Sequence, residues 1–115
     1  MFKKLRTVIY KVADLDAAKA WYIRITGQQP YFDQPFYVGF DIHGAELGLD
    51  PDTSNMQAGN QSVSYWAVEE VTTAIENLLA EGALLVQPKT NVGGDIFVAI
   101  VSDPFGNNIG LIEGA

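Results

Sequence analysis

Apolar positions recur along the chain in two matching series. Each series opens with a strand-like apolar run, one ending at Val12 and the other at Val68. In both cases an acidic residue that can begin a helix follows within two positions. The chain is therefore predicted to be an internal duplication.

Helical spacing of apolar residues follows each opening strand and predicts helices over 14–26 and 70–81. Asp14 has the residue type and position of an N-cap, and acidic residues at both helix starts suit the positive end of the helix dipole. Each helical pattern stops at a glycine, Gly27 or Gly82, as a left-handed C-cap requires.

Short strand-like runs follow each predicted helix. A turn at His43-Gly44 and a loop at 91–94 separate some of them, and the polar, Pro- and Gly-containing stretch 51–61 is predicted to be a linker between the halves. The predicted strands are 30–32, 36–42, 45–49, 84–87, 96–101 and 108–112.

The element order is thus β-α-β-β-β, repeated. It predicts an α+β fold: one domain over 1–115, with halves of about 1–50 and 62–115. Two such units can form a curved mixed sheet, a half-barrel cup with the helices on its outer face.

Composition narrows the setting. With 14 acidic and 7 basic residues, the net charge is −7, which disfavours nucleic acid and anionic membranes as partners. The chain has no cysteine, which excludes disulfides and thiolate sites and suits a reducing cytoplasm, where we expect the protein. No apolar run approaches a membrane span, and the basic start lacks the apolar segment of a secretory signal.

The end of the chain carries the most distinctive motif. Residues 102–113 contain an Asp103-Pro104-x-Gly106-Asn107 turn between two apolar runs, which predicts a tight hairpin. The segments 12–16 and 20–27 and this closing hairpin follow one another along the chain. In that order they resemble the vicinal-oxygen-chelate superfamily, which includes glyoxalase I, extradiol dioxygenases and bleomycin-resistance proteins. The resemblance implies the fold predicted above.

The resemblance also implies where a metal would be held. Metal-dependent members use one ligand from each of four strands, and the matching positions here are Thr7, Glu46, Val63 and Gly110. One carboxylate with these neighbours cannot hold a transition metal, so no metal and no cofactor are expected. A weaker alternative is a site built from His43, Glu46 and Asp50.

Strand alternation predicts which side chains line the cup. Leu47 and Leu49 are expected to pack under a helix, which leaves Glu46 facing the concave side. Gly39, Gly48 and Gly110 would remove side-chain bulk there and make room for a ligand or a partner backbone. The predicted ligand-binding residues are Thr7, Ile9, Tyr37, Asp41, Glu46, Val63, Tyr65 and Gly110.

Three functions remain open. The first is metal-free binding of a small organic molecule, as in bleomycin-resistance proteins and thus with a link to antibiotic resistance. This molecule would be partly apolar, with a cationic group as one option to satisfy an otherwise unpaired Glu46. The second is a metal-dependent lyase, isomerase or dioxygenase. The third is a metal-free enzyme in which burial raises the pKa of Glu46, its general acid or base. A homodimer is expected in each case.

Overall fold

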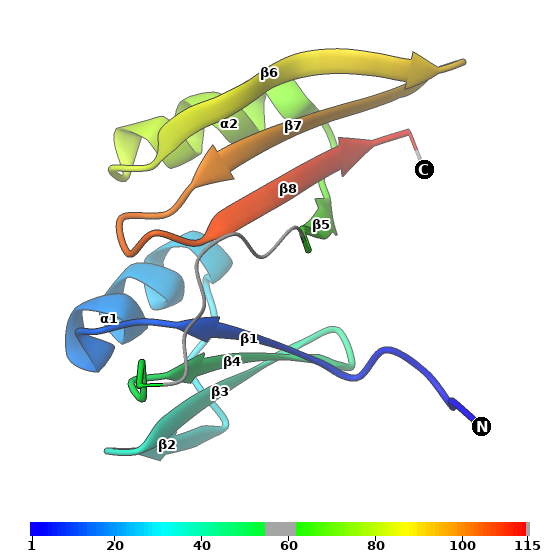
Figure 1. The fold of residues 1–115 in the computed structure, drawn as a ribbon. Helices are drawn as coiled ribbons and strands as arrows, with labels where there is room; N and C mark the ends of the chain where they lie inside the picture. The colour runs from blue at the N-terminus through cyan, green and yellow to red at the C-terminus, as the bar shows by residue number, and fades with distance from the viewer. Residues whose placement is uncertain (55–61, 115) are drawn as a thin grey trace. The chain divides into compact units, whose positions relative to one another are not determined.

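The structure is a computed structural model that describes residues 1–54 and 62–114. Within this part of the chain it contains eight strands and two helices in the predicted β-α-β-β-β order, twice over (Figure 1). The chain divides into two compact units, Met1–Ala58 and Gly59–Ala115. The α+β class and the repeat are confirmed. Most of the predicted linker, residues 55–61, lies outside the described residues.

The first unit has a four-stranded mixed sheet in the order β1-β4-β3-β2. β1 runs parallel to β4, and the other neighbours are antiparallel. Its elements are β1 (Thr7–Lys11), α1 (Leu15–Thr26), β2 (Phe32–Gln34), β3 (Tyr37–Ile42) and β4 (Ala45–Asp50).

One face of this sheet packs against α1. The helix begins after Asp14, whose side chain accepts a hydrogen bond from the Ala17 amide, and it ends at Gly27 with φ 68°. Its buried face meets alternate strand residues, and the ring centroids of Tyr10 and Tyr22 lie 6.0 Å apart. The buried side chains of this core include Trp21, Tyr22, Val38, Phe40, Leu47 and Leu49. The opposite face of the sheet is not covered by α1, so polar side chains can lie on it.

The second unit repeats this plan with a sheet in the order β5-β8-β7-β6, in which β5 runs parallel to β8. Its elements are β5 (Ser64–Ala67), α2 (Val71–Ala80), β6 (Leu84–Gly93), β7 (Ile96–Ser102) and β8 (Asn108–Glu113). In the described residues no helix is both long and apolar enough to cross a membrane.

Strand β6 corrects one prediction. Residues 91–93, expected in a loop, continue the strand, and the turn to β7 is limited to 94–95. The pairing of β6 with β7 shifts register at three places, and one of these shifts, between Gln87 and Thr90, spans Pro88, whose missing amide hydrogen interrupts a ladder. Asn91 supports the hairpin end, since its side chain accepts from the Gly93 amide and donates to the Gly94 carbonyl.

Candidate functional site

Strand pairing in the first unit places five predicted residues on the face of the sheet opposite α1. Glu46 is the cross-strand neighbour of both Thr7 and Asp41, and Ile9 is the neighbour of Gly48. Side chains alternate along each strand, so Tyr37 shares this face with Asp41. The residues buried under α1, Leu47 and Leu49 among them, are the alternate set.

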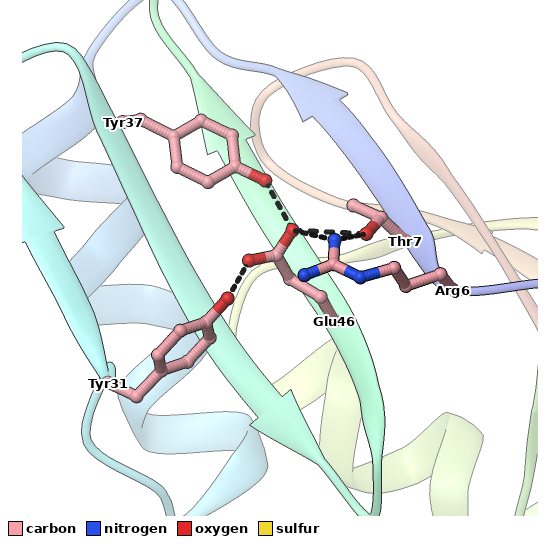
Figure 2. A network of polar contacts seen from close by, with 5 residues as sticks. All are labelled: Arg6, Thr7, Tyr31, Tyr37 and Glu46. Atoms are coloured by element: carbon pink, nitrogen blue, oxygen red, sulfur yellow. Dashed lines mark hydrogen bonds and ion pairs between the residues drawn. The ribbon is translucent and has the colours of Figure 1, made fainter.

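Glu46 is the centre of a polar network on this face (Figure 2). Its Oε1 accepts hydrogen bonds from the hydroxyls of Tyr37 at 2.9 Å and Thr7 at 3.1 Å, and its Oε2 accepts one from Tyr31. Arg6 Nη1 donates to Thr7 Oγ1 at 3.0 Å and lies 3.9 Å from Glu46 Oε1. We call these five residues the Glu46 cluster.

The cluster satisfies the Glu46 carboxylate from within the chain. The side chain is 13% exposed, and three hydroxyl groups already donate to its two oxygens. The expectation that this carboxylate would be unpaired and would require a donor from a ligand is therefore wrong. Buried carboxylates are usually paired in this way, because an unsatisfied charge is costly.

Two glycines provide the space in which the tyrosines lie. Gly39 and Gly48 are cross-strand neighbours. A Cβ on Gly48 would stand 1.9 Å from the hydroxyl oxygen of Tyr37, and one on Gly39 would stand 2.9 Å from Glu46 Oε2 and 3.3 Å from Cε1 of Tyr31. The space expected for a ligand or a partner backbone is thus filled by the chain's own side chains.

The network fixes the charge of its members near neutral pH. Burial raises the pKa of Glu46, but hydrogen bonds from Tyr31, Tyr37 and Thr7 and the charge of Arg6 lower it further than burial raises it, to below its usual 4.5. Burial, followed by the hydrogen bond to Glu46, raises the pKa of Tyr37 to about 12. The hydrogen bond to Glu46 is also the main cause that raises the pKa of Tyr31.

Glu46 is consequently an ionised acceptor, and both tyrosines are protonated donors. The predicted rise in the pKa of Glu46 is wrong, because its three hydroxyl donors outweigh burial. A general base is most effective when its pKa is near the working pH, and this carboxylate is shifted away from that range.

A cavity of about 180 Å³ lies beside the cluster. Its wall includes Asp41, which is held in place because its Oδ1 accepts a hydrogen bond from the Gly44 amide at 2.8 Å. Pockets for drug-sized ligands usually measure about 300–1,000 Å³, so this one has room for one end of a ligand. It is lined by Lys4, Arg6, Tyr31, Asp41, Gly44, Ala45 and Glu46.

The remaining predicted residues belong to the second unit. Tyr65 and Gly110 are cross-strand neighbours, and a Cβ on Gly110 would stand 2.6 Å from Cδ1 of Tyr65. Here too a tyrosine covers a glycine. Val63 is half-buried and directly precedes β5.

The alternative metal site does not assemble. Asp50 is bound to Lys11 at 2.8 Å, and His43 lies in the β3–β4 turn with φ 50°. Among the residues that the structure describes, no group of three histidine, cysteine or acidic side chains is arranged to hold a metal ion.

Sequence reasoning did not identify Arg6 and Tyr31 as members of the site. Arg6 precedes β1, so strand alternation gave no direction for its side chain. Tyr31 fell within the predicted strand 30–32, but the strand lies at Phe32–Gln34 and Tyr31 directly precedes it. The available signal was the pair Gly39 and Gly48, whose missing side chains indicate that a bulky group lies across the sheet.

Comparison with known proteins establishes the family. The sequence model of the Glyoxalase/Bleomycin resistance protein/Dioxygenase superfamily matches residues 4–111. The chain belongs to this superfamily. No curated protein matches the chain in sequence.

Solved structures share its fold. A glyoxalase/bleomycin resistance protein/dioxygenase family enzyme from Burkholderia phytofirmans PsJN superposes with a TM-score of 0.83 at 18% identity, over 98% of this chain and 100% of that one. Lactoylglutathione lyase from Agrobacterium tumefaciens gives 0.77 at 19% identity over 96% and 93%. A glyoxalase-related enzyme from Fulvimarina pelagi gives 0.77 at 18% identity over 98% and 89%.

The residues present do not fit the metal that this family implies. Of the four positions matched to metal ligands, Val63 and Gly110 offer no side-chain donor, and Thr7 offers a hydroxyl that already donates to Glu46. The one carboxylate already accepts hydrogen bonds from three hydroxyl groups, which it would have to give up to bind a cation with both oxygens.

Proposed function

We propose that this chain is a metal-free binding protein for a small organic molecule, of the bleomycin-resistance type within its superfamily. The observation that supports this most directly is the Glu46 cluster. The carboxylate at a family ligand position is held by Tyr31, Tyr37 and Thr7 and is ionised without a metal. Such a group is an anchor for hydrogen bonds and is poorly suited to proton transfer at neutral pH.

The surroundings of the cluster favour a partly apolar ligand. Ile9 is 50% exposed on the same face of the sheet, which also carries Phe32 and Tyr37 with their ring centroids 6.1 Å apart. Asp41 supplies a carboxylate at the cavity wall, against which a cationic group of the ligand would lie. The small cavity receives one end of such a molecule.

A thermal-shift screen of the purified protein against a compound library tests this function. We expect compounds that raise the melting temperature equally with and without a chelator, because binding to the folded state alone stabilises it. Tyr37→Phe removes one of the hydrogen bonds that hold the Glu46 anchor and should therefore weaken these compounds by up to about tenfold. Glu76→Gln, on the exposed side of α2, is the control and should have no effect.

Two results would contradict the proposal. One is about one metal ion per chain by elemental analysis, lost in Glu46→Gln. The other is turnover of a bound compound that disappears in the same variant, which would instead support the metal-free enzyme.

We also propose a homodimer. Strand β6 is an edge strand with four exposed large apolar residues, Leu84, Leu85, Val86 and Val92. An apolar edge of this kind is usually covered in a stable protein. Light scattering should show a dimer, and Val86→Glu should convert it to a monomer, whereas Thr72→Glu on α2 should not. A wild-type monomer throughout the micromolar range would refute this expectation.

A further inference from the structure

The two tyrosines of the Glu46 cluster are held differently. Tyr37 belongs to strand β3, is half-buried, and its hydroxyl lies over Gly48. Tyr31 precedes β2 and is 59% exposed, although its ring lies over Gly39 and its hydroxyl donates to Glu46. Tyr31 therefore fills a site on the sheet that solvent can reach.

Tyr31 also forms part of the wall of the cavity beside the cluster. Its ring lies over Gly39, and among the described residues its hydroxyl is the hydrogen-bond donor to Glu46 Oε2. If this side chain swings out, the surface above Gly39 becomes open and Oε2 loses its donor. A molecule of the right shape could then take both places.

We propose that the Tyr31 side chain mimics the ligand: the site accepts an aryl hydroxyl compound whose ring replaces that of Tyr31 above Gly39 and whose hydroxyl donates to Glu46 Oε2. This inference rests on the proposed binding function and names its ligand class. Tyr31 and the ligand compete for one position, so the tyrosine inhibits binding.

Three features of the site favour this class. Glu46 is ionised, so it accepts from a hydroxyl and repels a carboxylate or a phosphate. Arg6 lies 3.9 Å from the same carboxylate and opposes a cation placed directly on it. Gly39 has no side chain, which allows a flat ring to lie close to the sheet as that of Tyr31 does.

Tyr31 competes with the ligand, so the apparent affinity equals the affinity of the open site multiplied by the fraction of molecules in which the site is open. Tyr31→Ala should therefore bind para-cresol at least about tenfold more tightly than the wild type, as measured by titration calorimetry. Tyr31→Phe keeps the ring above Gly39 and should bind less tightly than Tyr31→Ala. Glu76→Ala, on the exposed side of α2, is the control and should match the wild type.

The donor is tested with para-methylanisole, which has the same ring but no hydroxyl hydrogen. We expect it not to bind Tyr31→Ala, and we expect Glu46→Gln in that background to weaken para-cresol about tenfold, since a neutral acceptor replaces a charged one. Para-cresol should also raise the melting temperature of Tyr31→Ala more than that of the wild type.

Equal para-cresol affinity in Tyr31→Ala and wild type, or equal affinity for para-cresol and para-methylanisole, would overturn the inference. The proposed function would still stand if compounds of another class stabilise the protein through Tyr37. If metal or turnover is found at Glu46, the proposed function itself fails. Failure of the aryl hydroxyl ligand class and failure of the proposed function therefore give different experimental results.

Discussion

Gly48→Ala is expected to displace Tyr37 from Glu46 and to lower the pKa of the Tyr37 phenol from about 12 towards its ordinary 10.0. The new Cβ would stand 1.9 Å from the phenol oxygen, so the ring must move. The backbone at Gly48 has no positive φ, so alanine itself is tolerated there. Overpacking of this kind lowers the free energy of unfolding by about 1–3 kcal/mol.

Ultraviolet absorbance of the phenolate and chemical denaturation measure both effects. Because the pKa of Tyr37 is raised in the folded state, its contribution to stability is present below about pH 10 and is lost as the pH rises towards 12. In Gly48→Ala this part of the loss of stability at alkaline pH should be absent. An unchanged high-pH titration in Gly48→Ala would show that Tyr37 does not depend on Gly48.

A double-mutant cycle separates the clash from other effects of the substitution. In a Tyr37→Ala background the ring is gone, and Gly48→Ala should be neutral or stabilising by up to about 1 kcal/mol, since glycine is unfavourable within a strand. Equal destabilisation by Gly48→Ala in both backgrounds would mean that the cost arises elsewhere.

Asp103→Ala is expected to lower the free energy of unfolding by about 3 kcal/mol. Asp103 is 3% exposed in the turn between β7 and β8. Its Oδ1 accepts from the amides of Phe105 at 2.9 Å and Asn107 at 2.7 Å, and its Oδ2 accepts from the Asn107 side chain at 3.2 Å. Removing such an acceptor leaves amide groups unsatisfied.

Denaturation of Asp103→Ala, Asp103→Asn and Asp95→Ala measures this contribution. Asp103→Asn keeps one oxygen acceptor and should fall between the wild type and Asp103→Ala. Asp95 lies exposed in the β6–β7 turn and is the matched control, which we expect to change stability by less than about 0.5 kcal/mol. If Asp103→Ala were as mild as Asp95→Ala, the hairpin would not depend on this side chain.

Local chemistry made much of the fold predictable. Asp14 and Gly27 delimit α1 within one residue because capping is decided by a few neighbouring groups. The end of β6 was harder to predict from the sequence. The strand near Asn91 is formed by pairing with β7, and its own residues show no apolar alternation. Pairing between strands decides such segments.

Strand alternation predicted which face of the sheet each site residue on a strand would occupy. It placed Thr7, Tyr37 and Glu46 on one face, as strand pairing now does. It could not indicate that Tyr31 and Tyr37 lie across Gly39 and Gly48 to reach Glu46, because rotamers and contacts between distant residues are not periodic properties of a strand. The predicted unpaired carboxylate was wrong for this reason.

The covering of a glycine by a tyrosine from a neighbouring strand occurs in both units, as Tyr37 over Gly48 and Tyr65 over Gly110. In evolutionary terms, each pair behaves as one heritable unit. A side chain at the glycine alone meets the ring, whereas loss of the ring alone uncovers bare backbone, so either single step is a disadvantage. The tyrosine and the glycine of one pair are therefore expected to be substituted together. The two pairs do not depend on each other, so the two halves of the duplication can diverge independently.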